Sequence, residues 1–252
     1  MTFDVPGDGY NRFMGRYSEP LAERFSDWVG VRAGDRVLHV GCGPGALTTR
    51  LVVRVGIDAV AAVDPSAPFR AAVSARLPGL DVRAATAEHL PFADDSFDHA
   101  LAQLVVHFMP DPIAGIVEMR RVTRAGGTVA TCVWDLFGAR GPISPLWTIA
   151  AEIDPAATGE AHLPGVRQGD LVRLGEAAGL TRVEETELPV TVTHPSFDEW
   201  WEPYLLGVGP AGAYVAGLDA TRRDRLRTEC LARLGPGPFD VTAVAWAMRG
   251  RA

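Results

Sequence analysis

Short apolar runs alternate with segments of helical periodicity between residues 36 and 135, and this alternation limits the possible folds more than any other feature of the chain. Five runs are predicted as buried strands, at residues 36–40, 59–64, 80–86, 97–106 and 128–134. Neighbouring parallel strands need a crossover connection, and a helix usually supplies it. The pattern therefore predicts an α/β fold with a doubly wound parallel sheet.

Helix signals stand between and after these runs. A short helix is predicted at 67–76, and a later one begins with Asp111 as its N-cap and Pro112 as its first residue. This later helix is expected to end at the glycine pair 126–127 and to bury Ile113, Ile116 and Val117. Beyond Trp134 the pattern predicts helices at 143–153, 169–178 and 219–234 and strands at 183–193 and 240–250.

Composition excludes several classes of protein. The chain has 252 residues, which suits a single domain, and its 24 basic residues are all arginine, so lysine chemistry is absent. A net charge of −7 argues against nucleic acid or an anionic membrane as the main partner. Three scattered cysteines and six histidines without metal-ligand spacing predict neither a disulfide framework nor a metal site. With no signal peptide and no run of about 18 apolar residues, we expect a cytoplasmic protein with no membrane partner.

The sequence VLHVGCGPG, at residues 37–45, carries the chemistry. A predicted strand runs into Gly41, Gly43 and Gly45, and a helix follows at once, which suits a ligand that closely approaches the backbone at a helix N-terminus. Asp64 closes the second strand, 23 residues beyond Gly41, where a carboxylate can accept hydrogen bonds from both ribose hydroxyls. Two alternatives stay open: Asp64 could instead cap the helix that starts near Ser66, and the glycine spacing also fits a dinucleotide site.

Four segments in this order resemble class I S-adenosylmethionine-dependent methyltransferases of the small-molecule type, with a methyltransferase-11-like domain. They are the run at 37–45, VDPS at 63–66, AEHLPFADDSFD at 87–98 and RRVTRAGGTV at 120–129. The resemblance covers the whole chain and implies a Rossmann-like seven-stranded sheet of order 3-2-1-4-5-7-6 with strand 7 antiparallel. It also implies one domain made of N-terminal lid helices (1–35), a cofactor-binding half (36–135) and a substrate-side half (136–252) with a helical cap between strands 6 and 7.

The resemblance also implies a cofactor site for S-adenosylmethionine. Its members, with the parts of the cofactor they would meet, are Gly41, Cys42 and Gly43 (methionine and ribose), Asp64 (ribose), Pro65, Ser66, Ala87 and Glu88 (adenine), Gln103 (methionine), and Arg16 and Tyr17 of the lid (methionine carboxylate). Two further site positions depart from the family pattern, because His39 and Thr86 stand where acids are usual. A threonine hydroxyl accepts a hydrogen bond more weakly than a carboxylate, so we expect reduced cofactor affinity.

Candidate groups for catalysis and acceptor binding are less specific. His107, just past the fourth strand, and His194, after the sixth, are the candidate general bases, and a structural role for either stays open. An aromatic set, Trp147, Trp200, Trp201 and Tyr204, is expected either to line an acceptor cavity or to pack the cap onto the sheet.

The predicted function is methyl transfer to a small-molecule acceptor, at oxygen or nitrogen in preference to carbon. One alternative is an NAD(P)-dependent oxidoreductase, which the glycine spacing alone allows. Another is a protein that binds S-adenosylmethionine without chemistry, which the departures at His39 and Thr86 make conceivable. A monomer or a homodimer is expected, and the sequence does not decide between them.

Overall fold

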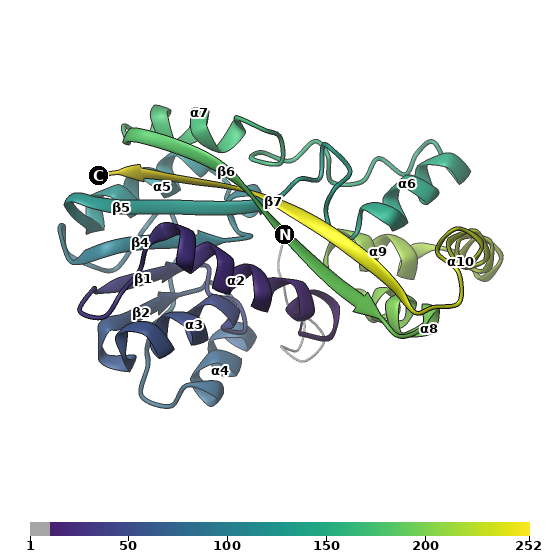
Figure 1. Cartoon of the computed structure of the whole chain (residues 1–252), viewed down its shortest axis with the longest axis horizontal. Coiled ribbons are helices and arrows are strands. Elements are labelled where there is room, and N and C mark those ends of the chain that lie inside the picture. The colour runs from purple at the N-terminus through teal and green to yellow at the C-terminus, as the bar shows by residue number, and fades with distance from the viewer. Residues whose placement is uncertain (1–10) are drawn as a thin grey trace.

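The computed structural model describes residues 11–252, which form one seven-stranded mixed sheet flanked by helices (Figure 1). The strands are β1 (Val37–Val40), β2 (Val60–Val63), β3 (Asp81–Arg83), β4 (Phe97–Gln103), β5 (Thr123–Trp134), β6 (Thr181–His194) and β7 (Phe239–Arg251). Their order is β3-β2-β1-β4-β5-β7-β6, with β7 antiparallel to β5 and β6 and the other pairs parallel. The predicted α/β fold, strand order and reversed seventh strand are confirmed.

Helices cover both faces of this sheet. The α-helices are α2 (Arg16–Val29), α3 (Ala46–Val55), α4 (Ala67–Arg76), α5 (Pro112–Val122), α6 (Ser144–Ile153), α7 (Asp170–Ala177), α8 (Phe197–Trp201), α9 (Gly209–Gly217) and α10 (Ala220–Leu234). The short π and 3-10 helices are η1 (Asn11–Gly15), η2 (Ile57–Ala59), η3 (Val106–Phe108) and η4 (Glu202–Leu206). Leu101 of β4 packs in one core cluster with residues of α2 and α3, whereas its neighbour Ala100 packs in a second cluster with residues of α5 and α7. Since successive strand side chains point to opposite faces, the two clusters lie on opposite sides of the sheet.

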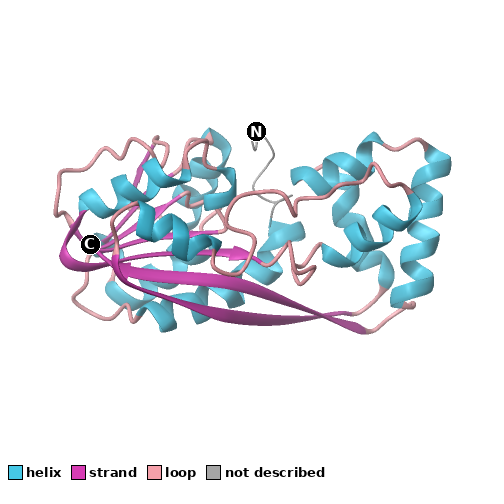
Figure 2. Cartoon of the chain, turned by 90° about the horizontal axis from the view of Figure 1, so that it is seen from above, coloured by secondary structure: helices cyan, strands magenta, loops and turns pink. Residues whose placement is uncertain are grey.

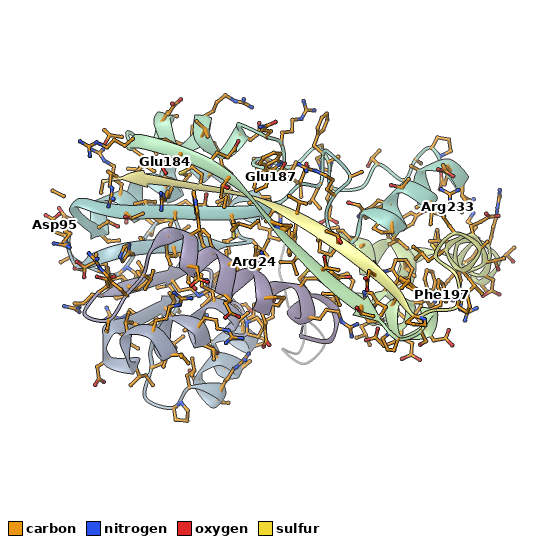
Figure 3. The ribbon with its side chains drawn as sticks, viewed as in Figure 1. Arg24, Asp95, Glu184, Glu187, Phe197 and Arg233 are labelled. Carbon is orange, nitrogen blue, oxygen red and sulfur yellow. The ribbon has the colours of Figure 1, made fainter. Side chains whose placement is uncertain are left out.

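The last two strands extend beyond the sheet as a long antiparallel pair. Figure 2 shows them reaching a separate group of helices, formed by α6, α8, α9 and α10. Figure 3 places Phe197, at the start of α8, and Arg233, on α10, at this far end. Arg233 forms an ion pair with Glu152 of α6, at 2.7 Å from Nη2 to Oε2, which ties the cap helices together. The helices α8, α9 and α10 lie between β6 and β7 and form the cap that the sequence predicts, and α6, from the segment between β5 and β6, packs with them.

The helix α5 differs from its prediction in two ways. It ends at Val122, because β5 begins at once and runs through the glycine pair. A Cβ on Gly127 would lie 2.7 Å from the carbonyl oxygen of Asp98, so this glycine serves strand pairing and does not end a helix. Of the residues predicted to face inward, Ile116 is buried, but Ile113 and Val117 are 41% and 43% exposed.

The segment predicted as a lid contributes one well-packed helix. Residues 1–10 lie outside the described part of the chain, and α2 follows the turn η1. Leu21, Ala22 and Phe25 of α2 are fully buried, because this face packs against α3 and the sheet. Within residues 11–252, no helix has the length and hydropathy that a membrane span requires.

Candidate active site

A cavity of about 530 Å³ opens at the carboxyl ends of β1, β2 and β4. Its wall comes from the turn after β1, the turn after β2, the loop at 85–88, and Gln103 with the residues that follow it. Ligands of open α/β sheets bind in this position, where the chain leaves neighbouring strands toward opposite faces. The volume lies within the usual range for small-molecule sites.

The turn after β1 brings the backbone to the cavity. Gly41 has φ of +69°, and a Cβ there would lie 2.5 Å from Cγ2 of Val105. Gly43 has φ of +52°, and a Cβ there would meet no heavy atom within 4 Å, because the residue borders open space. Glycine at these positions therefore relieves backbone strain and lets a ligand approach the main chain.

Asp64 joins this turn to the end of β2. Its two carboxylate oxygens accept hydrogen bonds from the backbone N–H groups of Gly43 and Ser66, both at 2.8 Å. Burial raises the pKa of Asp64, while the two N–H donors oppose that shift. The Oγ of Ser66 accepts from the N–H of Phe69, at 3.4 Å, so Ser66 and not Asp64 caps α4. Each Asp64 oxygen keeps acceptor capacity for a further donor, such as a hydroxyl.

Two buried residues of the cavity wall carry polar atoms without partners in the described part of the chain. His39 Nδ1 is 2.8 Å from Oγ1 of Thr48, and His39 Nε2 has no hydrogen-bond partner among the described residues. Burial lowers the pKa of His39 to about 3, so its imidazole is neutral near pH 7. Gln103 donates through Nε2 to the carbonyl oxygen of Ser18, at 2.9 Å, and its Oε1 is likewise unpartnered within residues 11–252. Buried polar atoms are normally satisfied, so both side chains keep unused hydrogen-bonding capacity beside the cavity.

Most of the remaining cofactor candidates line the cavity, and two residues of α2 do not. Those that line the cavity are Cys42, Pro65, Ser66, Thr86, Ala87 and Glu88. Burial raises the pKa of the Cys42 thiol far above its ordinary value, which favours a space-filling role. Ser18 also lines the cavity, although no local motif marks it in the sequence.

Arg16 and Tyr17 do not reach this cavity, contrary to their predicted role. The hydroxyl of Tyr17 is 2.7 Å from Nε2 of His194, and Arg16 pairs with Glu199 and approaches Nδ1 of His194 at 3.1 Å. His194 is 2% exposed and lies at the end of β6, so it joins α2 to the cap. This network surrounds a void of only about 10 Å³, which places the candidate base His194 outside the cavity.

The predicted aromatic set mainly packs the cap. Trp200, Trp201 and Tyr204 are each 3% exposed and contact one another, and the two tryptophans also contact Phe197, with ring centroids 5.0 to 6.4 Å apart. None of these three aromatic residues lines the main cavity. Aromatic clusters of this kind bury large apolar areas, so they attach the cap to the strand pair.

A second chamber, of about 50 Å³, adjoins the main cavity. The two share Leu104 and Phe108 as lining residues, and the chamber also contains His107 and Glu160. Burial lowers the pKa of His107 to about 3, so this candidate base is neutral near pH 7. Glu160 lies in the loop between α6 and α7, where no motif signals it, and its Oε2 accepts a hydrogen bond from Nε1 of Trp147 at 3.1 Å.

The charged residues that line the main cavity are acidic, while Arg70 lies just behind this lining and donates to the backbone carbonyl oxygens of Asp64 and Pro65, both at 2.8 Å. Asp64 and Glu88 line the cavity, and none of its described lining residues is an arginine. Such a wall suits a cationic ligand better than a pyrophosphate. Within residues 11–252 no group of three His, Cys, Asp or Glu side chains could hold a metal ion.

Comparisons with known proteins agree with this geometry. The family described as "Methyltransferase domain" matches residues 38–131. An uncharacterized methyltransferase of Mycobacterium tuberculosis is 42% identical over 109 residues, which are 43% of this chain and 43% of that protein. An uncharacterized protein of the same organism is 30% identical over 215 residues, which are 79% of this chain and 77% of that protein.

Solved structures share the fold. A putative methyltransferase of Bacillus halodurans matches with a TM-score of 0.59 and 17% identity, over 91% of this chain and 97% of that one. A putative methyltransferase from an antibiotic biosynthesis pathway of Anabaena variabilis matches with a TM-score of 0.60 and 19% identity, over 90% and 95%. With its strand order, its glycine turn and these relatives, the chain belongs to the class I S-adenosylmethionine-dependent methyltransferase family.

Proposed function

We propose that this protein transfers a methyl group from S-adenosylmethionine to a small-molecule acceptor, at oxygen or nitrogen. The observation that carries the proposal is the carboxylate of Asp64, hydrogen-bonded to the glycine turn at the wall of a cavity of about 530 Å³. The family supplies the cofactor, and the lining residues fit it. The net charge of −7 supports a small molecule over a nucleic acid as acceptor.

The cavity residues would hold the cofactor through distinct groups. Asp64 would accept from the ribose hydroxyls, and the side chains of Gln103 and His39 would border the polar methionine end. Thr86 and Glu88 would border the adenine. When bound, S-adenosylmethionine supplies an electrophilic methyl group, and the electron pair of the broken carbon–sulfur bond stays on sulfur. The chain contributes orientation and exclusion of water, which are large terms in such displacements.

The oxidoreductase alternative is disfavoured by two features of the same wall. In a dinucleotide site the glycine-turn N–H groups and the helix N-terminus bind the pyrophosphate. Here the N–H of Gly43 is donated to Asp64, and two carboxylates line the cavity without an arginine among its described lining residues. We therefore expect NAD(P) to bind poorly. A binding protein without activity is the remaining alternative, and it calls for a direct assay.

Ligand-induced thermal shift tests the cofactor, with S-adenosylmethionine, S-adenosylhomocysteine, NAD and NADP as ligands. A ligand present at about 100 times its dissociation constant stabilises the folded protein by about 2.7 kcal/mol, which is readily measured. We expect stabilisation by the first two ligands only. Transfer of a labelled methyl group to a small-molecule extract then tests activity, and cofactor binding without any transfer would favour the non-catalytic alternative.

A further inference from the structure

The small chamber beside the main cavity has the position expected for the reacting end of an acceptor. Leu104 and Phe108 separate it from the cavity proposed for the cofactor. Its other walls come from the end of β5, the start of α6, and the first residues of α9, so the sheet and the cap both contribute. A water molecule needs about 10–15 Å³ measured in this way, so about 50 Å³ admits a few non-hydrogen atoms.

Glu160 differs from the other buried carboxyl groups of residues 11–252. Asp64 receives two backbone N–H donors, and Asp135 receives the N–H of Gly138 at 2.7 Å and Nε of Arg140 at 2.6 Å. Glu160 is 6% exposed, yet within the described residues its carboxyl receives one hydrogen bond, from Trp147, and forms no ion pair. A buried carboxylate is normally paired, so this one lacks a partner that a ligand can supply.

Two other residues of the chamber wall carry buried polar atoms that lack partners in the part of the chain that the structure describes. Nδ1 of His107 and Nε1 of Trp134 have no hydrogen-bond partner within residues 11–252, and these side chains are 7% and 4% exposed. Both residues line the chamber together with Glu160, and the rest of its wall is apolar. These two nitrogen atoms lie behind the apolar wall, whereas Oε1 of Glu160 accepts no hydrogen bond from residues 11–252 and is not among the fully buried atoms. Glu160 is therefore the polar group that can orient a small ligand in this apolar space.

We propose that this chamber binds the reacting end of the methyl acceptor, an apolar molecule with a hydroxyl or amino group, and that Glu160 accepts the proton of that group. The inference rests on the function proposed above. The proton passes from the acceptor oxygen or nitrogen to a carboxylate oxygen of Glu160. The electron pair of the broken bond stays on the acceptor atom and forms the new bond to the methyl carbon. Acceptors that present a carboxylate or phosphate are excluded, because no arginine is among the described residues that line the chamber.

The protonation behaviour of the chamber supports Glu160 over His107 as the base. Burial raises the pKa of Glu160 to about 7, although the hydrogen bond from Trp147 partly opposes this rise. Burial holds the pKa of His107 at about 3. A general base is most effective with a pKa near the working pH, which fits Glu160. The charge of Glu160 also acts on Tyr204, whose pKa lies well above 10 mainly because of burial.

Binding of three size-matched probes tests this inference. The probes are n-propylamine, 1-propanol and propionate, titrated by ligand-observed NMR into protein loaded with S-adenosylhomocysteine. We expect saturable binding of the amine and the alcohol and none of propionate. Glu160→Gln, which keeps the acceptor for Trp147, should weaken n-propylamine about tenfold or more.

Two controls separate this inference from the proposed function. Glu176→Gln changes an exposed carboxyl on α7 and should leave probe binding unaltered. Affinity for S-adenosylhomocysteine should be the same in the wild type and both variants, which also shows that they are folded. Equal binding of propionate, no saturable binding of any probe, or unchanged amine affinity in Glu160→Gln would overturn the inference alone. Failure of the wild type to bind S-adenosylhomocysteine would overturn the proposed function and this inference with it.

Discussion

Replacing Glu160 by glutamine should stabilise the ligand-free protein at neutral and alkaline pH. The pKa of this carboxyl is about 7 in the folded protein, against an ordinary value of 4.5. Between these values the folded state binds more protons than the unfolded state, so the free energy of unfolding falls as pH rises, by about 1.4 kcal/mol per pH unit. The total loss is about 3 kcal/mol, complete above the folded pKa. Glutamine does not ionise, so the variant escapes this loss.

Urea denaturation, followed by tryptophan fluorescence from about pH 4 to about pH 8, measures the effect. The difference in unfolding free energy between Glu160→Gln and the wild type should be near zero at the acid end and approach about 3 kcal/mol at the alkaline end. The exposed Glu176→Gln should show no such trend. A difference that does not change with pH, or that favours the wild type at alkaline pH, would refute the account of Glu160.

Three further substitutions probe other parts of the molecule. Gly41→Ala places a Cβ 2.5 Å from Cγ2 of Val105 at a residue with positive φ, so urea denaturation should show that the free energy of unfolding falls by about 2–4 kcal/mol. An unchanged free energy of unfolding would contradict the packing described. Thr86→Asp gives the adenine a stronger acceptor and should tighten S-adenosylmethionine binding about tenfold by calorimetry; no gain removes the claim. His194→Ala removes the hydrogen bond with Tyr17 and should lower the free energy of unfolding by about 2–4 kcal/mol without altering cofactor affinity. A change in cofactor affinity would place His194 in the cofactor site.

The cofactor side of the molecule could be predicted from the sequence because it is built from local signals. A buried strand, a glycine turn and an acid at the end of the next strand are each visible within a few residues, and parallel pairing of β1 and β2 brings them together. The cap also follows from the chain, since the last two strands are separated by the predicted helical segment. The same holds for Asp111, which caps α5 as predicted and accepts from the N–H of Ala114 at 3.0 Å.

The acceptor side could not be predicted, because it depends on contacts between distant segments. Glu160 belongs to an irregular loop, and only the packing of that loop against α9 and the end of β5 gives its carboxyl a chamber. Arg16 and Tyr17 look like cofactor ligands in the chain, but α2 directs them toward His194, 177 residues from Tyr17. Trp200 and Trp201 fit a pocket or a core equally well by composition, and burial against the strand pair decides for the core.

Titration calorimetry with S-adenosylhomocysteine on the wild type, Asp64→Asn and the exposed control Asp58→Asn tests the central claim most directly. An asparagine at position 64 can accept from only one of the two N–H groups that Asp64 now holds and loses the charge that strengthens a hydroxyl hydrogen bond. We predict one binding site per chain, affinity about 10- to 100-fold weaker in Asp64→Asn, and unchanged affinity in the control. Equal affinity in a folded Asp64→Asn variant, or no binding to the wild type, would contradict this prediction.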